Sequence, residues 1–503
     1  MLRKLRITLA ALAFTLCTLI FLDFSGALSA WAGWMARIQF LPAVLAANVA
    51  VIAALLLVTL VFGRIYCSVI CPLGVYQDIV SHLSGKRKKF RMRFHYTSEK
   101  KWLRYGVLVL FIIAIVAGIN AFVAFLAPYS TYGRFVQNLF SPVWIWGNNL
   151  LALAAEKMDS YAFAHKEVWI RNIPTFAVTA VMSVIITVMA WKGGRTWCNS
   201  ICPVGTFLSF FSRFSLLRPV IDTEKCRNCH LCEKKCKASC IDLENHKIDY
   251  SRCVDCFDCM DNCKFGAMQY RPFWKKKSSA DKAGNPETSG TAPADAGRRA
   301  FITSSVIAAG ALTLKAQEKK VDGGYAAVTG KKAPERTSPI VPFGAGGEKN
   351  FYSHCTGCQL CVSQCPNNVL RPSSSLEHLM QPEMSYEKGW CRIECTKCSE
   401  VCPAGAILAV KPEEKTSIHI GLASVDLDLC VVNRDGVSCG NCARHCPAGA
   451  IMMVRKDPSD ENSLRIPTVN ESRCIGCGAC EYLCPSRPFS AIHVNGLKSH
   501  RND

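Results

Sequence analysis

Cysteine spacing is the feature of this sequence that most restricts its fold. Sixteen of the 30 cysteines lie in four groups near the C-terminus, and in each group a cysteine followed by proline comes four residues after the third member. The sixteen are Cys355, Cys358, Cys361, Cys365, Cys391, Cys395, Cys398, Cys402, Cys430, Cys439, Cys442, Cys446, Cys474, Cys477, Cys480 and Cys484. In bacterial ferredoxins this spacing lets three neighbouring thiolates hold one [4Fe-4S] cube while the fourth binds another.

Zinc is the alternative metal for these cysteines, because Cys-x2-Cys also suits zinc knuckles. A zinc site does not need a third cysteine and then a fourth before proline, repeated four times. The repetition therefore favours iron–sulfur clusters and predicts electron transfer. Residues 350–503 are expected to form a small α+β four-cluster domain that depends largely on its metal sites for stability.

Eight further cysteines precede this domain in two groups of the same spacing. They are Cys226, Cys229, Cys232, Cys236, Cys253, Cys256, Cys259 and Cys263. Residues 221–275 are therefore predicted to be an α+β two-cluster ferredoxin unit, with Cys263 on the first cube and Cys236 on the second. Together the two regions predict six [4Fe-4S] clusters, two in this unit and four in the C-terminal domain.

This two-cluster unit departs from the usual pattern at three positions. Lys237 and Lys264 stand where proline normally follows the closing cysteine, so the ligands are kept but the local turn is less predictable. Cys240 is surplus by spacing. We expect it to bind no cluster, the other reading being an alternative fourth ligand.

Four long apolar runs come before the cysteine groups: Ile7–Phe24, Leu41–Phe62, Tyr105–Ala127 and Ile173–Trp191. Each is about long enough to cross a hydrocarbon core of roughly 30 Å as a helix. Residues 1–220 are therefore predicted to be an α-helical membrane domain with four transmembrane helices. Lysine and arginine concentrate at the N-terminus and in the 63–102 loop, which places both, and the two-cluster unit, in the cytoplasm.

A repeated motif marks the cytoplasmic ends of the second and fourth runs. Gly-Arg-x-aromatic-Cys-x3-Cys-Pro-x-Gly begins at Gly63 and again at Gly194, and its cysteines are Cys67, Cys71, Cys198 and Cys202. Cysteines four residues apart share one helix face, so two such helices could present four thiols to one another. The motif is a candidate redox or metal site. The alternative is a repeated helix end in which thiols pack as small apolar groups.

Residues 276–349 read as linkers around a candidate export signal at 297–314. Arg298 and Arg299 precede a short apolar stretch, and the segment resembles a twin-arginine signal. Export of an already folded domain would keep its thiols out of an oxidising compartment until the clusters are in place. The C-terminal domain is accordingly expected in the periplasm, with the segment either cleaved or kept as a fifth helix. The alternative is a basic linker followed by a packing or interfacial helix.

These motifs resemble two protein families. Residues 1–275 are similar to NapH-type membrane ferredoxin proteins, and residues 297–503 are similar to NapG-type exported polyferredoxins. The resemblance implies a fusion of two partners of periplasmic nitrate reductase systems in the cytoplasmic (inner) membrane. Such a module would oxidise quinol from the quinone pool and pass electrons to a periplasmic reductase or c-type cytochrome. The quinol would dock near the first cubes or the cysteine pairs.

Composition excludes one class of partner and leaves two rival functions. The formal charge of +21 suggests nucleic acid binding, but six clusters of about −2 each would lower it to about +9, so we expect no nucleic acid partner. The membrane half also resembles copper-reducing assembly factors and NosR-type regulators. A copper-reducing factor for a respiratory enzyme would bind copper at Cys67, Cys71, Cys198 and Cys202, and a redox-sensing regulator would signal without turnover. Six clusters favour conduction over both.

Overall fold

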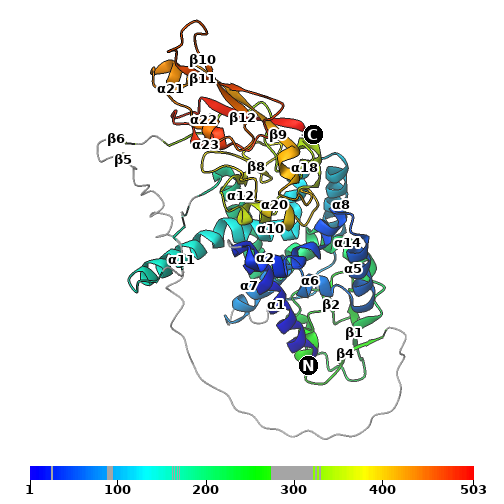
Figure 1. Cartoon of the computed structure of the whole chain (residues 1–503). Coiled ribbons are helices and arrows are strands. Elements are labelled where there is room, and N and C mark those ends of the chain that lie inside the picture. The colour runs from blue at the N-terminus through cyan, green and yellow to red at the C-terminus, as the bar shows by residue number, and fades with distance from the viewer. Residues whose placement is uncertain are drawn as a thin grey trace.

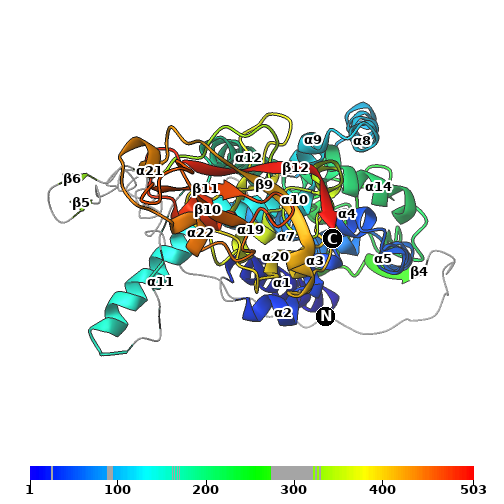
Figure 2. The ribbon, with the colours of Figure 1, turned by 45° about the horizontal axis from the view of Figure 1, so that its top comes forward.

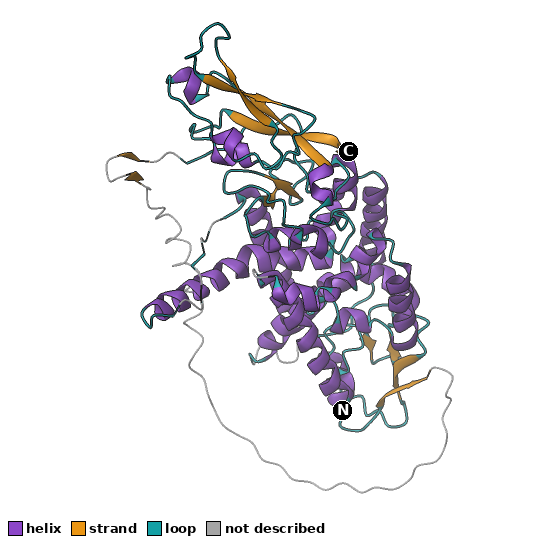
Figure 3. Ribbon diagram, viewed as in Figure 1, coloured by secondary structure: helices purple, strands orange, loops and turns teal. Residues whose placement is uncertain are grey.

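The computed structural model describes residues 1–23, 26–87, 94–160, 163, 165, 166, 168, 170–272, 321, 322, 326, 327 and 330–502. The twin arginines, Arg298 and Arg299, and the whole stretch 297–314 lie outside the described residues. Figure 3 shows helices filling the middle of the molecule and strands at its two ends.

The first part of the chain is helical throughout (Figure 1). Its elements are α1 (Leu2–Leu22), α2 (Ala27–Ala32), α3 (Trp34–Arg37), α4 (Phe40–Leu45), α5 (Val49–Phe62), α6 (Ile65–Val69), α7 (Pro72–Gly85), α8 (Lys101–Val116), α9 (Asn120–Leu126), α10 (Pro128–Phe135), the π-helix η2 (Val136–Phe140), α11 (Ser141–Glu156), α12 (Ile173–Gly193), α13 (Thr196–Ser200) and α14 (Pro203–Ser212).

Two of the four predicted spans form single long helices. Among the described residues, α1 and α12, with 21 residues each, are the helices long and apolar enough to cross a membrane. The second run divides into α4 and α5, because the Asn48 side chain caps a new helix by accepting the N–H of Val51. The third run divides at Gly118, whose φ of +74° interrupts the helix between α8 and α9. Four continuous spans therefore stay a prediction.

The first ferredoxin unit, residues 217–272, follows α14 directly. It contains β1 (Leu217–Ile221), α15 (Leu231–Lys234), β2 (Ile241–Asp242), β3 (Lys247–Ile248), α16 (Asp258–Asp261) and β4 (Met268–Pro272). β1 pairs antiparallel with β4, with Leu217 opposite Pro272, and β2 pairs with β3. Two short helices between two small hairpin-like sheets give the α+β arrangement expected from the cysteine spacing.

The C-terminal ferredoxin domain, residues 330–502, repeats this plan on a larger scale. Its elements are α18 (Glu348–His354), α19 (Leu360–Gln364), β7 (Leu370–Pro372), β8 (Pro382–Met384), α20 (Lys397–Val401), the 3-10 helix η3 (Glu414–Ser417), β9 (Ile418–Val425), α21 (Val431–Arg434), α22 (Asn441–Arg444), β10 (Ile451–Arg455), β11 (Arg465–Val469), α23 (Ala479–Leu483) and β12 (Ile492–Asn502). The antiparallel pairs are β7–β8, β9–β12 and β10–β11, and a separate hairpin joins β5 (Val321–Asp322) to β6 (Ala326–Ala327).

The two ferredoxin regions lie at opposite ends of the helices in Figure 1, and in Figure 2 the C-terminal domain is turned towards the viewer. At the start of α1, Arg3 forms ion pairs with Asp258 and Asp261 of the first unit. At the other end of α1, the side chain of Gln364 donates to the carbonyl groups of Ile20 and Asp23. A helix of 21 residues is about 31 Å long, which is close to the thickness of a bilayer core.

Helix α12 also contacts both ferredoxin regions. Its N-terminal end meets the C-terminal domain, and its C-terminal end meets the first unit. Before its first residue, Asn172 donates to the carbonyl of Pro372 in the C-terminal domain. Just after its last residue, the N–H of Arg195 donates to the carbonyl of Lys237 in the first unit, at 2.9 Å. Both long helices therefore connect one ferredoxin region to the other.

Candidate iron–sulfur centres

The first ferredoxin unit gathers its eight predicted ligand cysteines around two cavities. One cavity is lined by Cys226, Cys229, Cys232 and Cys263. The other is lined by Cys236, Cys253, Cys256 and Cys259. Each cavity thus takes three cysteines from one group and the closing cysteine from the other, which is the exchange expected from the spacing.

A common backbone conformation wraps the cysteine loops around these cavities. In the first group Asn228 and His230 have φ of +48° and +56°, and in the second group Asp255 and Phe257 have φ of +48° and +60°. Two left-handed residues separated by one residue curl the loop so that successive N–H groups turn towards its concave side. Glycine is favoured at such positions, and it occupies both in the group that starts at Cys474.

The C-terminal domain also exchanges its closing cysteines between groups. Cys365 lines a cavity with Cys391, Cys395 and Cys398, and Cys446 lines another with Cys474, Cys477 and Cys480. Cys402 interacts electrostatically with Cys355, Cys358 and Cys361. Burial raises the pKa of Cys442 to about 11, and the nearby thiols of Cys439, Cys484 and Cys430 contribute to the shift. Four cavities therefore each gather four of the predicted ligands, and the other eight cysteines neighbour one another in two groups, so six bound clusters stay a prediction.

Contacts link these four sets one to the next. The Cys355 set touches the helices, because the carbonyl oxygen of Cys358 lies against Gly133 of α10, and Cys365 of the second set lines a cavity together with Phe21 of α1. Cys361 of this set neighbours Cys398 of the next. That second set meets the third where the N–H of Cys391 donates to the carbonyl of Cys477, at 3.0 Å. The Cys430 set lies beside α21 and α22, at the end farthest from α1 in Figure 1.

The chemistry of these sets fits polynuclear iron–sulfur clusters. All thirty cysteines are free thiols, and among the described residues no group of three or more His, Cys, Asp or Glu side chains is placed to hold a single metal ion. Several sulfurs also accept hydrogen bonds from backbone N–H groups, as Cys446 does from Ala450 at 3.3 Å and Cys484 does from Ala491 at 3.3 Å. Such bonds tune the potential of a bound cluster.

Cys240, which spacing marks as surplus, lies inside one of the six sites. It lines the same cavity as the Cys253 group, and its sulfur is 3.5 Å from the sulfur of Cys236. Five thiols therefore surround that cavity. Spacing left open whether Cys240 is a surplus thiol or an alternative fourth ligand, and the short turn between α15 and β2 brings it to the cavity.

Lys237, one of the two residues that replace proline, anchors the first unit to the helices. Its ammonium group is 3.0 Å from the carboxylate of Asp258 and 3.7 Å from that of Asp78 in α7. Lys264, at the equivalent position of the other group, is exposed. The first substitution therefore serves docking, and proline would remove the charged side chain that makes these contacts.

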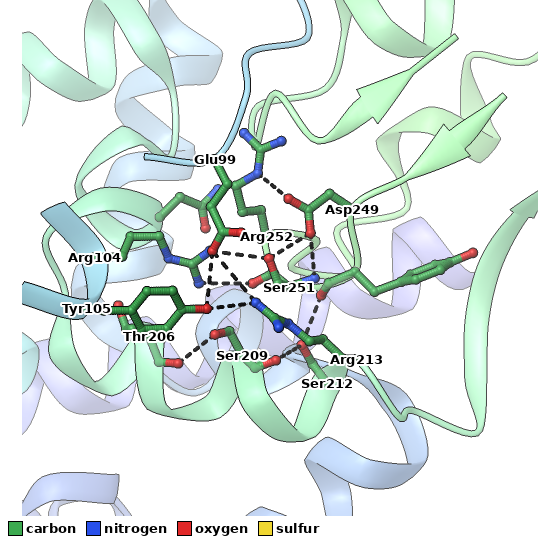
Figure 4. A network of polar contacts seen from close by, with 12 residues as sticks. Glu99, Arg104, Tyr105, Thr206, Ser209, Ser212, Arg213, Asp249, Ser251 and Arg252 are labelled. Atoms are coloured by element: carbon green, nitrogen blue, oxygen red, sulfur yellow. Dashed lines mark hydrogen bonds and ion pairs between the residues drawn. The ribbon is translucent and has the colours of Figure 1, made fainter. Parts of the chain in front are cut away.

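A polar network completes this docking surface (Figure 4). Arg104 of α8 donates to Glu99 and to the hydroxyl and carbonyl oxygens of Ser251. The hydroxyl of Ser212, at the end of α14, donates to the carbonyl of Tyr250, at 2.9 Å. These buried contacts hold the first unit in one orientation against α8 and α14.

The four cysteines of the repeated motif meet inside the helical part. α6 and α7 form one helical hairpin and α13 and α14 form another, and each hairpin carries its second cysteine at the start of the longer helix. The thiols of Cys67, Cys71, Cys198 and Cys202 are all buried and interact electrostatically with one another. None of them lies in a ferredoxin loop.

Two arginines lock the hairpins together in a reciprocal way. Arg195, from the second repeat, donates to the carbonyl of Cys67 in the first, at 2.6 Å. Arg64, from the first repeat, donates to the carbonyl of Cys198 at 3.4 Å and to the side chain of Asn199 at 3.1 Å. Both arginine side chains are fully buried. We call this exchange the arginine clasp.

The carboxylate of Asp78 balances the charge of one side of the clasp. It accepts two hydrogen bonds from Arg195, both at 2.8 Å, and also pairs with Arg6 of α1. Burial alone would raise the pKa of Asp78, but Arg195, Lys237 and Arg6 outweigh it and hold this pKa well below its usual range. The second repeat has no equivalent carboxylate, since Ser209 stands at the matching position.

A cavity of about 380 Å³ opens beside the C-terminal domain at the far end of α1. Its apolar walls include Phe21, Leu22, Ile145 and Phe176. Its polar lining includes Gln137, Asn138, His165, Gln359 and the predicted cluster ligand Cys365. The two cations Lys166 and Arg171 also line it, so the walls are mixed, and the volume is in the range of small-molecule sites.

Two family models match the chain, and both describe iron–sulfur proteins. A 4Fe-4S binding domain matches residues 44–91 and 175–221, which contain the two hairpins. A 4Fe-4S dicluster domain matches residues 354–431 and 437–487, which contain the C-terminal cysteine groups.

Curated relatives are ferredoxin-type proteins or have no assigned role. The methylamine utilization ferredoxin-type protein MauM of Methylobacillus flagellatus is 32% identical over 166 residues, which is 32% of this chain and 70% of the relative. The ferredoxin-type protein NapF of Escherichia coli is 25% identical over 181 residues, which is 36% of this chain and 99% of the relative. The uncharacterized protein MJ0749 of Methanocaldococcus jannaschii is 25% identical over 249 residues, which is 48% of this chain and 78% of the relative. No solved structure matches the chain.

Proposed function

This chain belongs to the MauM family of ferredoxin-type proteins, and we propose that it oxidises quinol in the cytoplasmic membrane and passes the electrons to a partner outside. It is an iron–sulfur electron-transfer protein, related also to NapF. We propose that the partner is a periplasmic reductase, of nitrate-reductase type, or a c-type cytochrome. In this view the chain joins a NapH-like membrane half to a NapG-like exported half.

The observation that carries the proposal is the contact of α1 with ferredoxin regions at both of its ends. If α1 crosses the membrane, the first unit and the C-terminal domain lie on opposite sides of it. The basic residues of the N-terminus and the 63–102 loop favour the cytoplasm for the first unit. The C-terminal domain then faces the periplasm, and the proposed export signal would account for its crossing.

Exposed apolar side chains support a membrane for more than the two longest helices. α8 exposes Val109, Leu110, Ile112 and Ile113, and α5 exposes Leu57. α12 exposes Val181, Val184, Ile185 and Val188 in the same way. Helices that face water seldom show contiguous apolar surface of this extent, whereas helices that face lipid do. We therefore keep four membrane-crossing segments, of which the second and third combine two helices each.

The cavity beside Cys365 is the place that best suits a quinol. Phe21, Ile145 and Phe176 would contact a quinone ring, and Asn138 and His165 would offer hydrogen bonds to its oxygens. Oxidation of one quinol releases two electrons and two protons, and the protons would leave through polar groups such as His165. Iron–sulfur clusters, when bound, accept electrons one at a time. This position is at the opposite end of α1 from the one suggested by the sequence.

Anaerobic reduction by a menaquinol analogue tests the proposal. We expect the wild-type clusters to be reduced, as seen by absorbance and electron paramagnetic resonance (EPR). Ile145→Trp should fill the cavity and slow this reduction by about tenfold or more, equivalent to about 1.4 kcal/mol. Reduction by dithionite should not change.

Val143→Trp is the matched control, because Val143 is on the same helix, is 66% exposed and does not line the cavity. Equal quinol rates in the two variants would remove the cavity from the proposal. Clusters that dithionite reduces but quinol does not would overturn quinol oxidation itself.

A further inference from the structure

The four thiols of the hairpins lie between the two ferredoxin regions. One continuous buried cluster of side chains contains Val254 of the first unit, Cys67, Cys71 and Cys202 of the hairpins, and Cys358 of the C-terminal domain. Cys256, a predicted ligand of the first unit, packs against the same cluster. The path from one region to the other is therefore filled by protein, with three of the four hairpin thiols along it.

The length of α7 shows how far Cys71 lies from the end of the helical part that meets the first unit. Ser84, near the end of α7, donates to the carbonyl of Trp191, near the end of α12 that meets the first unit. α7 has 14 residues and is about 21 Å long, and Cys71 stands immediately before its first residue. Cys71 is therefore well inside the helical part, away from both of its ends.

Arg64 supplies independent evidence that the site holds a negatively charged group. Its side chain is fully buried, and the carboxylate of Asp255 interacts with its charge and accepts its backbone N–H, but no ion pair within 4.0 Å joins it to a carboxylate of the described residues. It donates to oxygens of Asn199, Ser251 and Cys198, while its Nε has no partner. A buried guanidinium needs a compensating charge. Four thiolates around a cluster provide it, whereas four neutral thiols do not.

The sulfurs receive hydrogen bonds like those in the ferredoxin groups. The amide of Gln77 donates to the sulfur of Cys198, at 3.2 Å, and the N–H of Gly205 donates to the sulfur of Cys202, at 3.4 Å. Gly74 stands in the same relation to Cys71.

We propose that Cys67, Cys71, Cys198 and Cys202 together bind one polynuclear iron–sulfur cluster, shared between the two hairpins and distinct from the six ferredoxin sets. This cluster connects the first ferredoxin unit electrically to the C-terminal domain. One electron enters it from one side and one leaves it on the other, so no bond is formed or broken and no proton is taken up. The proposal does not depend on quinol as the substrate.

Iron analysis of the anaerobically purified full chain is the first test. Cys71→Ser should lower iron and acid-labile sulfide by about two to four atoms each per chain and remove one EPR signal. Cys17→Ser is the matched control, since Cys17 is a buried thiol of the same packed cluster but belongs to no set of four. Unchanged iron in a folded Cys71→Ser protein would overturn the proposal. So would stoichiometric copper that the wild type holds and the variant loses.

A second variant keeps the proposal testable if Cys71→Ser does not fold. Gln77→Leu removes one hydrogen bond to sulfur without removing a ligand. We expect the full iron content and a lower reduction potential for one EPR signal, because hydrogen bonds to sulfur stabilise the reduced form. Potentials equal to those of the wild type for every signal would contradict a cluster at Cys198.

Electrical connection is tested in sealed vesicles in which proteinase can reach the C-terminal domain. A membrane-impermeant reductant, titanium(III) citrate, is added outside and both sets of ferredoxin signals are followed. We expect reduction of both regions in the wild type and in Cys17→Ser, but only of the C-terminal domain in Cys71→Ser. Reduction of the first unit in Cys71→Ser would refute the connection. No quinol is present, so failure here is separate from failure of the proposed function.

Discussion

The ferredoxin groups and the hairpin cysteines both bring four thiols together, but they do so with different kinds of contact. In four of the six ferredoxin groups, the loop places three cysteines within seven residues, and its curl comes from two left-handed backbone positions. The hairpin site takes two cysteines from each of two distant segments and depends on the arginine clasp to align them. We infer that the first kind of site is built locally, whereas the second exists only once the helices have packed.

The strongest way to break this comparison is to remove the clasp. Arg195→Met leaves Asp78 buried with fewer positive partners, and we expect a loss of about 3–5 kcal/mol in the free energy of unfolding. Unfolding of the helical part in mixed detergent micelles measures it. The ferredoxin signals in EPR should remain, because their loops do not contain Arg195.

Arg434→Ala is the control for this variant. Arg434 pairs with Asp435 in an exposed position, and such pairs contribute little to stability. We expect no measurable loss. If Arg195→Met behaved in the same way, the hairpins would not depend on the clasp.

A smaller loss of stability is expected when a methyl group is placed against the arginine clasp. A Cβ at Gly74 would be 2.2 Å from the carbonyl oxygen of Cys67 and 2.8 Å from Nη1 of Arg195. Gly74→Ala should therefore cost about 1–3 kcal/mol through forced shifts. Gly85→Ala, in the same helix, meets no atom within 4 Å and should not destabilise the protein. Thermal denaturation in detergent compares the two.

A still smaller loss of stability is expected when the contacts between the first ferredoxin unit and the helices are weakened. Lys237→Met removes contacts with Asp258 and Asp78 but leaves both carboxylates with arginine partners, so we expect about 1–2 kcal/mol. Hydrogen exchange should rise in residues 217–272 and remain unchanged in residues 330–502. Lys264→Met, at the equivalent exposed position, should change neither region. A similar rise in both variants would mean that Lys237 has no special role in docking.

The smallest effect, no change in iron content, is expected when Cys240 is replaced. Cys240→Ser should keep the iron content of the wild type, because Cys236, Cys253, Cys256 and Cys259 already form a set of four. Loss of about four iron atoms per chain would instead identify Cys240 as a ligand. Cys236→Ser provides the comparison, and it should lose that iron.

Sequence was sufficient to find the cysteine groups and to predict the exchange of Cys236 and Cys263, because spacing is a local property, but it did not indicate which closing cysteine joins which set in the C-terminal domain. It was less informative about the helices. The second and third apolar runs gave no sign that Asn48 would start a new helix or that Gly118 would end one. Hydropathy records composition, whereas these breaks depend on a cap and on one left-handed residue.

The contacts between distant segments could not be predicted from sequence. The Gly-Arg pair before each cysteine pair was visible as part of the repeat, but nothing indicated that each arginine binds the other repeat. Lys237 was noticed only as a missing proline, and its partner Asp78 lies in a helix with no obvious charge pattern. A search for charged residues next to both copies of a repeat would have found Arg64 and Arg195.

The two contacts of α1 have a consequence for how the protein is made. α1 leaves the ribosome before either of its partners, so Arg3 must wait for Asp258, and Ile20 must wait for Gln364. If the C-terminal domain folds and acquires its metal before it crosses the membrane, the far end of α1 stays uncovered for the whole of that interval. A helix synthesised before both of its partners is thus among the last to be completed, and its fit to Gln364 marks the arrival of a finished domain.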